Sequence, residues 1–190
     1  VNDEVIFATQ YSNNPLTNGT GNNTHVFFLM EYDVQPGMRR DTENGRPFKR
    51  YMPTDYTLNV IFADRENDSR YQQSFKHTYY SNNPGTFNTS FDHSKSQVNF
   101  AAGDTAIYVP GYEMSERLFP TLNKHLDPGR ADLTQFQGTR DYISFRLADT
   151  YLLLAEAQLK QDKIAEATEN VNMVRRRAAF PGKEGEMEIS

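Results

Sequence analysis

The stretch DYISFRLADTYLLLAEAQLKQDKIAEATENVNMVRRRA, residues 141–178, carries the most regular hydrophobic pattern in the chain. Apolar residues recur at helical spacing as far as Leu159 and again from Ile164 onward, with the polar segment Gln161–Lys163 between them. The pattern predicts two helices, with helical structure beginning near Tyr142. Because the connection is so tight, the two helices must pack antiparallel as a hairpin.

A membrane span and a nucleic-acid-binding helix are both poor interpretations of this stretch. Its longest uninterrupted apolar run, Tyr151–Ala155, is far shorter than the roughly 20 residues that cross a bilayer. The basic run Arg175–Arg177 stands at a predicted helix end, where cations stabilise the helix dipole without any ligand. The chain also has a formal net charge of −5, which gives no electrostatic footprint for nucleic acid.

Acidic residues raise the question of catalysis or metal binding. Asp149 and Glu156 lie about two turns apart on one helix face, but we favour their pairing with Arg146, Arg175 or Arg177. A glycan-processing enzyme would need two convergent carboxylates about 5–10 Å apart, and nothing in the sequence requires them. The acids of segment 64–70 lack the ligand spacing and the glycine of a calcium loop, so local Asp–Arg pairing is expected there.

The predicted hairpin follows the tetratricopeptide pattern. In that pattern large and small residues of the first helix meet small and large residues of the second. The matching positions are Tyr151, Leu154, Ala155, Ala167 and Val171, whereas Gln158 and Val174 depart from the pattern. Ala155 and Ala167 would let the two backbones approach closely. A single such unit cannot bury its own faces, so this degenerate repeat implies further packing partners.

Composition limits the remaining possibilities. The 190 residues suffice for a single domain, but they are only 37% apolar, with a mean hydropathy of −0.76. We therefore expect many surface loops, or a piece of a larger protein, since the chain begins at Val1 and stops without an obvious terminal element. Cysteine is absent, which excludes disulfides, thiolate catalysis and Cys-based zinc sites.

Residues 1–140 are predicted to be rich in loops with short elements. A short helix is expected near 54–63, capped by Thr54, with Leu58, Ile61 and Phe62 on one face. The predicted strands are Glu4–Gln10, Arg70–Tyr80 (with Tyr71, Phe75 and Tyr79 on one side) and Thr105–Val109. The predicted long loops are Tyr11–Asn23, Gln35–Arg50 and Ser81–Gln97. Val26–Tyr32 fits either a strand or a buried helical turn.

The hairpin sequence resembles the signature of the RagB/SusD family of Bacteroidetes outer-membrane lipoproteins. Its signature positions include Arg146, Tyr151, Ala155, Glu156, Asn172, Arg175 and Arg177. Asp149 replaces the usual glutamate, and Asp162 takes the usual glycine place in the turn, a mild departure because Asp tolerates left-handed backbone. Segments 4–12, 53–75 and 118–130 resemble further family stretches in the same order.

The resemblance implies a fold that is mainly α, with irregular loops and a few short strands. Residues 1–190 would form a single SusD-like region from the C-terminal half of a longer protein. Within it, a loop-rich part, 1–140, would precede the tetratricopeptide-like hairpin, 141–178. The tail, 179–190, would lead into further sequence.

The resemblance also implies a function. Such a protein is not an enzyme and uses no cofactor or metal. It binds oligosaccharides or polysaccharide fragments at the cell surface and passes them to a SusC-like TonB-dependent transporter, with no nucleic-acid partner. Its location would be the outer membrane, held by a lipid anchor outside this sequence. The alternatives are a docking module of the uptake complex and a binder of a non-glycan nutrient.

The candidate ligand residues follow from the way in which proteins bind sugars. Aromatic faces stack on pyranose rings, and Asn, Asp and Arg side chains, usually on loops, bond the hydroxyl groups. The candidates on this ground are Tyr11, Asn13, Asn14, Tyr79, Tyr80 and Asn82. The four histidines, His25, His77, His93 and His125, show no metal-ligand spacing and are interpreted as solvated loop residues.

Overall fold

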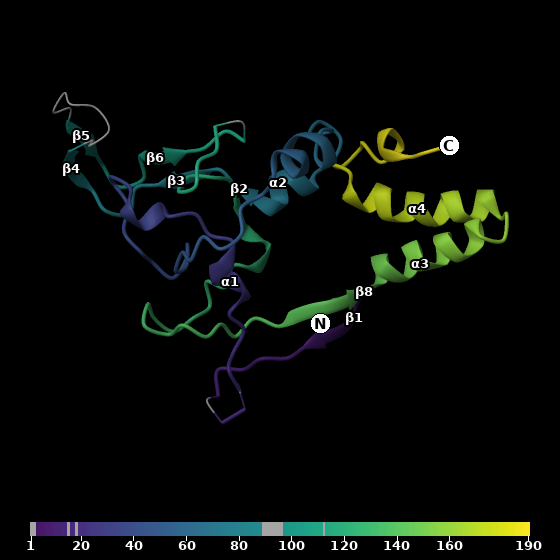
Figure 1. Ribbon diagram of the computed structural model, residues 1–190, viewed down its shortest axis with the longest axis horizontal. Helices are drawn as coiled ribbons and strands as arrows, with labels where there is room; N and C mark the ends of the chain where they lie inside the picture. The colour runs from purple at the N-terminus through teal and green to yellow at the C-terminus, as the bar shows by residue number, and fades with distance from the viewer. Residues whose placement is uncertain (1–2, 15, 18, 89–96, 112) are drawn as a thin grey trace. The chain divides into compact units, whose positions relative to one another are not determined.

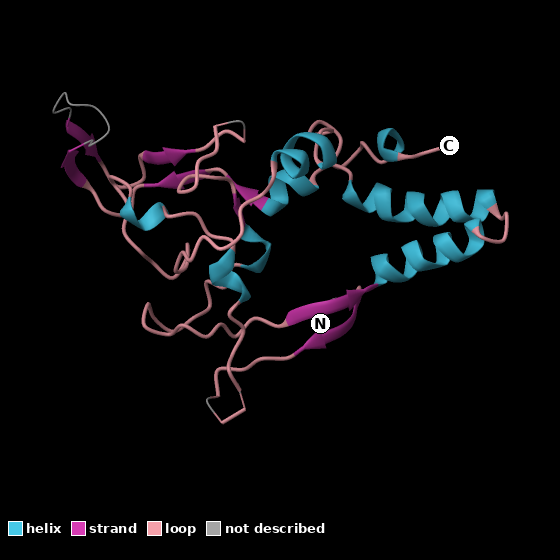
Figure 2. Ribbon diagram, viewed as in Figure 1, coloured by secondary structure: helices cyan, strands magenta, loops and turns pink. Residues whose placement is uncertain are grey.

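The computed structural model describes residues 3–14, 16–17, 19–88, 97–111 and 113–190. These residues form a mixed, mostly irregular fold of helices and short strands (Figures 1 and 2). The chain divides into two units, considered separately below. Unit 1 consists of Val1–Tyr11, Phe62–Gln72 and Asp141–Ser190, and unit 2 of Ser12–Ile61 and Gln73–Arg140.

The helices are α1 (Thr24–Phe27), α2 (Arg70–Ser74), α3 (Leu147–Leu159) and α4 (Ile164–Ala178). Single turns of 3-10 or π-helix occupy Tyr32–Val34, Thr57–Ile61, Asn123–His125 and Gly185–Met187. The strands are β1 (Val5–Thr9), β2 (Phe75–Lys76), β3 (Thr78–Tyr80), β4 (Gly85–Asn88), β5 (Gln97–Phe100), β6 (Thr105–Tyr108), β7 (Thr121–Leu122) and β8 (Tyr142–Arg146). They form two-stranded antiparallel ribbons: β1–β8, β2–β7, β3–β6 and β4–β5.

The helical hairpin of unit 1 is present: α3 and α4 lie side by side and antiparallel (Figure 1). Ala155 and Ala167 are buried, with exposed fractions of 5% and 6%, as expected where two helix backbones approach closely. Asp162 in the connecting turn has φ +58°, so it adopts the left-handed conformation expected of the residue in the glycine place.

The predicted start of the hairpin is wrong. Residues Tyr142–Arg146 form β8, which pairs with β1, and the helix begins only at Leu147. Phe145 lies opposite Phe7 and Ile143 opposite Ala8, so aromatic and β-branched side chains favour strand pairing here. The carboxylate of Asp149 accepts a hydrogen bond from the backbone N–H of Arg146 at 3.0 Å, which caps the new helix.

The expected ion pairs between the hairpin carboxylates and arginines are also wrong. Asp149 bonds the backbone of Arg146 rather than its side chain, and Glu156 pairs with Lys160 at 2.5 Å. The Arg177 guanidinium instead binds the carboxylate of Glu4, which ties the end of α4 to the start of the chain. Predicted pairing in segment 64–70 is confirmed, since Arg70 meets Asp68 at 2.5 Å.

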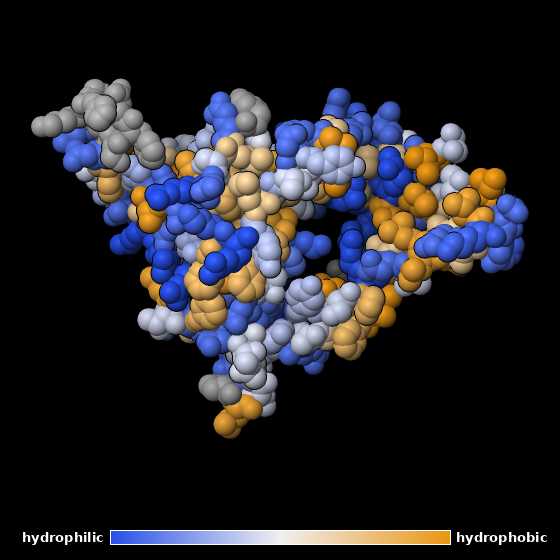
Figure 3. Space-filling model, viewed as in Figure 1, coloured by the Kyte–Doolittle hydropathy of each residue, from blue (hydrophilic) through white to orange (hydrophobic). Residues whose placement is uncertain are grey.

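Much of α3 remains apolar and exposed. Leu152, Leu153, Leu154 and Leu159 all face solvent, Leu153 with 66% of its surface exposed. Figure 3 shows apolar residues along the surface of the hairpin. A helix that is hydrophobic all round is normally buried on all sides, so α3 is built to be covered by more than α4.

Unit 2 is organised around a core of large side chains. The buried members are Met30, Tyr32, Met38, Tyr79, Ile107, Val109 and Phe119. The rings of Tyr32 and Tyr79 stack with their centroids 5.2 Å apart. Tyr79 and Ile107 are directly paired residues of β3 and β6, so one face of this ribbon covers the core while the other faces solvent.

Several local predictions need correction. The helix near 54–63 exists, with a hydrogen bond from the Thr57 N–H to Thr54 Oγ1 at 3.1 Å, but its regular part is a π-helical turn, Thr57–Ile61, in which Leu58 is buried and Ile61 exposed. The predicted strand Arg70–Tyr80 begins instead as α2 and becomes strand only at Phe75. A spacing of four residues keeps Tyr71, Phe75 and Tyr79 on one side in either structure, and all three are buried.

Short regular elements also occur in two further segments, Ser81–Gln97 and Val26–Tyr32. The predicted loop Ser81–Gln97 contains β4, which pairs with β5 to form a hairpin, and its residues 89–96 lie outside the described part. Val26–Tyr32 adopts the helical alternative, with α1 ending at Phe27 and a 3-10 turn beginning at Tyr32. The strands predicted at Glu4–Gln10 and Thr105–Val109 are confirmed as β1 and β6.

Candidate ligand-binding surface

Tyr79 belongs to the core of unit 2 and not to a surface. Its exposed fraction is 1%, and burial raises the pKa of its hydroxyl well above the ordinary value. One face of its ring packs on Tyr32, and the Lys76 ammonium lies 4.5 Å from the ring centroid. A sugar cannot stack on this ring without opening the core.

The predicted asparagines make mainly structural contacts. The side-chain oxygen of Asn82 accepts from the Arg39 N–H at 2.8 Å, and its amide donates to the Arg39 carbonyl and to the Asp41 carboxylate. Asn14 turns its own loop by accepting from the Leu16 N–H at 3.0 Å. Asn13 is exposed on the same loop. Asn14 thus stabilises a local turn, and Asn82 joins two segments that are distant in the sequence.

Tyr11 and Tyr80 have different environments. Tyr11 lies in unit 1, is partly buried, and donates its backbone N–H to Asp141 at 3.0 Å. Tyr80 is 60% exposed on the outer face of the β3–β6 ribbon. Tyr108 pairs with Thr78 on that face and is 66% exposed, so Tyr80 has a second free tyrosine as a neighbour. Of the predicted candidates, Tyr80 is the one best placed to meet a ligand.

The largest aromatic assembly in the described part of the chain was missed at the sequence level. We call it the aromatic strip; it runs in order through Phe136, Phe48, Phe27, Tyr51, Phe28 and His125, all in unit 2. Successive ring centroids are 5.3, 6.5, 6.1, 5.3 and 5.3 Å apart. Tyr51 is 58% exposed and the other rings are partly exposed. Such a row offers flat apolar surface with polar edges.

The end of α1 explains why these rings meet. A four-residue helix leaves its carbonyl groups unsatisfied, and segment 48–51 supplies the missing donors. The N–H groups of Arg50 and Tyr51 both donate to the Phe27 carbonyl, at 2.9 and 3.0 Å, and that of Phe48 donates to Val26 at 3.0 Å. Lys49 has φ +40°, a kink that few non-glycine residues adopt. The backbone thus places Phe48 and Tyr51 on either side of Phe27.

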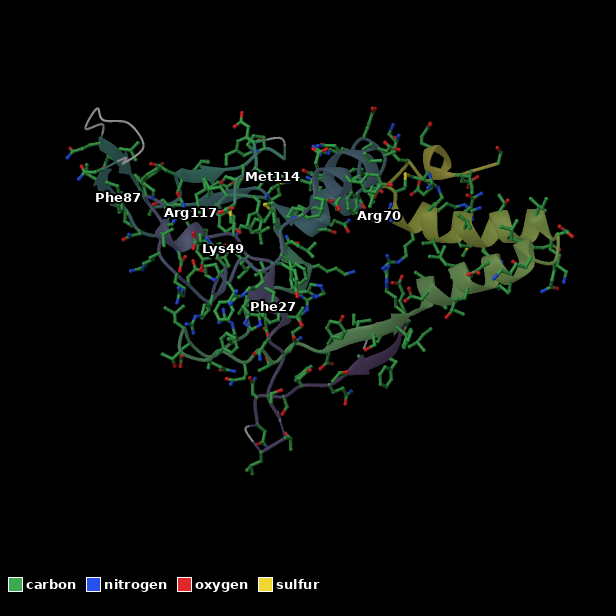
Figure 4. The ribbon with its side chains drawn as sticks, in the orientation of Figure 1. Phe27, Lys49, Arg70, Phe87, Met114 and Arg117 are labelled. Atoms are coloured by element: carbon green, nitrogen blue, oxygen red, sulfur yellow. The ribbon has the colours of Figure 1, made fainter. Side chains whose placement is uncertain are left out.

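Cations surround the strip. The Arg46 guanidinium lies 5.3 Å from the Phe48 centroid and 5.8 Å from that of Phe136. Lys49 is neutralised by Glu31 at 3.2 Å, an acid that also meets Arg117 at 3.5 Å; Lys49, Arg117 and Phe27 are labelled in Figure 4. The sequence signal was RPFKRY, residues 46–51, in which basic and aromatic residues alternate within what was interpreted as a polar loop.

The histidines are not simply solvated. His25 is buried, and its Nδ1–H donates to the Asn22 carbonyl at 3.0 Å. Burial, helped by the charge of Arg130, lowers the pKa of His25. Burial also lowers the pKa of His125, as do the nearby charges of Lys124 and Arg140. The Nδ1–H of His77 donates to the Val109 carbonyl at 2.8 Å. His93 lies outside the described residues.

The described residues contain no candidate metal site or membrane-spanning helix. Among the described residues, no group of three or more His, Asp or Glu side chains is arranged to hold a metal ion. In the same part of the chain, no helix combines the length and hydrophobicity needed to span a bilayer.

Comparison with known proteins places the chain in a family. The model of the SusD family matches residues 3–190, and the chain therefore belongs to the SusD family, also called RagB/SusD. The match covers both units and the aromatic strip as well as the hairpin signature. No curated protein matches the chain significantly.

Proposed function

We propose that this protein captures glycans or oligosaccharides at the cell surface, without catalysis, for import with a SusC-like TonB-dependent transporter. Membership of the SusD family supports nutrient binding and an association with the outer membrane. The aromatic strip is the observation that supports a specific binding site. The ring of Tyr51 is exposed there and contacts both Phe27 and Phe28.

The aromatic strip is preorganised for stacking on a sugar. The face of a sugar ring is apolar and stacks on aromatic rings, while its hydroxyl groups need polar partners at the rim. Ring-to-ring contacts hold the strip in place, and backbone hydrogen bonds to the end of α1 fix segment 48–51, so little side-chain entropy is lost on binding. Tyr80 and Tyr108 offer a second, smaller aromatic surface in the same unit.

The test is calorimetric titration of the intact protein with a panel of neutral and acidic oligosaccharides. We expect heat with at least one glycan, and we expect Tyr51→Ala to remove it while Tyr80→Ala weakens it less. Tyr56→Ala is a matched control, because Tyr56 is equally exposed and has no ring contact with the strip among the described residues. The absence of heat with every glycan would contradict the proposal and favour a non-glycan nutrient.

A docking function is the second candidate, and the exposed leucines of α3 favour it. We propose that the hairpin acts as a tetratricopeptide-type unit whose outer apolar face is covered in the uptake complex. A mostly apolar cavity of about 260 Å³ near the start of α3, lined among others by Leu147, Tyr151 and Met173, would add to this face. Leu153→Glu should then abolish co-purification with the transporter and leave the glycan titration unchanged.

A further inference from the structure

Arg46 is the cation most closely associated with the strip, and its charge is not used within the described protein. Its guanidinium carbon lies over both Phe48 and Phe136, whose rings stack with centroids 5.3 Å apart. The residue is exposed, and no carboxylate among the described residues pairs with it. The guanidinium carbon is 5.3 and 5.8 Å from the two ring centroids and the residue is exposed, so its N–H groups are available to an acceptor.

The other cations near the strip point to the same chemistry. Arg50 adjoins Tyr51 in sequence, is exposed, and forms no ion pair within the described residues. Lys124 and Arg140 lie close enough to His125 for their charges to act on its ring, and Arg140 holds its place by donating to the Leu126 carbonyl at 2.8 Å. Positive groups thus flank both ends of the strip and its exposed centre.

Three acids of this part of unit 2 have partners of their own. Glu31 is shared between Lys49 and Arg117. Asp127 is buried and accepts backbone N–H groups of Gly129, Thr139 and Arg140 at 3.1, 2.6 and 2.9 Å. Asp132 accepts from Thr134 and Gln135. Arg46 and Arg50 thus have no carboxylate partner among the described residues, although the chain as a whole carries a net charge of −5.

We propose that the strip binds an anionic glycan, with Tyr51 stacking on a sugar ring and Arg46 forming a bidentate contact with a carboxylate or sulfate. This inference rests on the proposed function and narrows its substrate class. A guanidinium held beside two aromatic rings is preorganised for an anion, which reduces the entropy lost on binding. Single-stranded nucleic acid has similar chemistry, but the negative net charge of the chain disfavours a long polyanion.

The experiment compares an acidic hexamer with its uncharged methyl ester and with a sulfated hexasaccharide. The intact protein is titrated with hexagalacturonic acid, with its fully methyl-esterified form, and with a sulfated heparin hexasaccharide, at low and at moderate salt. We expect one of the acidic hexamers to bind at least about tenfold more tightly than the ester, the contribution of one charge-assisted hydrogen bond, and to weaken with salt. Binding of hexagalacturonic acid would identify the anion as a carboxylate, and binding of the heparin hexasaccharide alone would identify it as a sulfate.

Substitutions test whether Arg46 causes the preference for the acidic hexamer. Arg46→Gln should lower the affinity for the acidic hexamer by about tenfold and leave the ester unchanged. Arg39→Gln, at another exposed arginine of unit 2 that has no ring contact with the strip, should change neither. Equal binding of the acidic and esterified forms overturns the inference while the proposed function stands. Binding of none of the three ligands overturns the inference, whereas the proposed function falls only if the neutral oligosaccharides of the panel also give no heat. Equally tight binding of a single-stranded DNA of matched charge overturns the choice of a glycan.

Discussion

Asn172 and Ile189 hold each other by a reciprocal pair of hydrogen bonds. The Asn172 amide donates to the Ile189 carbonyl at 3.0 Å, and its oxygen accepts the Ile189 N–H at 2.9 Å. Asn172 is 5% exposed, and its side chain serves as a piece of β-ladder for the C-terminal segment. The neighbouring Arg175 donates to the Met187 carbonyl of the same segment. The signature positions of α4 thus anchor the chain that follows it.

Asn172→Ala is predicted to lower the free energy of unfolding by about 1–3 kcal/mol, because both hydrogen bonds between its buried side chain and the Ile189 backbone are lost. Asn170 lies two residues earlier in the same helix and is more exposed. Asn170→Ala should therefore lower the free energy of unfolding by less than about 1 kcal/mol. Urea denaturation followed by circular dichroism measures both. Equal effects would mean that the pair with Ile189 contributes nothing particular.

Asp162→Gly is predicted to be neutral or to stabilise by up to about 1 kcal/mol, because glycine adopts positive φ without a steric cost. Asp162→Val should instead destabilise by about 1–2 kcal/mol, since a β-branched residue is strained in this conformation. Thermal unfolding of the two variants provides the comparison. A more stable valine variant would show that the turn is not left-handed in solution.

Ala155→Leu is predicted to destabilise the protein by about 1–3 kcal/mol, because the larger side chain would force α3 and α4 apart. Ala157→Leu on the exposed side of α3 is the matched control and should have little effect. The change in denaturation midpoint measures both, and a harmless Ala155→Leu would argue against close packing of the hairpin.

The stability of the protein is predicted to fall as pH falls below about 6.5, partly through His25. Burial lowers the pKa of His25 from 6.5 in the folded state, helped by Arg130 and opposed by the Asn22 carbonyl and Asp127. The unfolded chain therefore takes up a proton first, so the stability is full above this pH and is lost as pH decreases through it. His125, whose pKa is also lowered, acts in the same direction.

The measurement is the free energy of unfolding between pH 7.5 and pH 5, taken as an approximate range around the ordinary histidine pKa. His25→Gln should flatten the curve, and His125→Gln should flatten it further. An unchanged slope in the double variant would mean that these two side chains titrate alike in the folded and unfolded states.

The hairpin could be predicted from the sequence because its pattern is local. Helical spacing, the polar turn and the glycine-like place of Asp162 all depend on neighbouring residues. The start of α3 could not be predicted from neighbouring residues. Tyr142–Arg146 forms a strand because it pairs with β1, more than a hundred residues earlier in the chain. Spacing likewise identified the buried side of Tyr71, Phe75 and Tyr79 but not the change from helix to strand between them.

The candidate site was predicted less well, for a physical reason. Asparagines and tyrosines on loops are equally suited to structural contacts and to sugar binding. In the structure Asn82 bonds the distant segment 39–41, and Tyr79 lies in the core. The aromatic strip brings together four separate segments, around Phe27, Phe48, His125 and Phe136. Its one local signal was the alternation of basic and aromatic residues at 46–51.

The central claim is that ligand is captured at the aromatic strip while the hairpin carries the family signature without touching it. Amide hydrogen exchange, with and without the glycan that gives the largest heat, tests it most directly. The account predicts slower exchange in segments 46–51 and 123–126 on binding, with segment 147–178 unchanged. Slower exchange confined to the hairpin, with segment 46–51 unaffected, would contradict it.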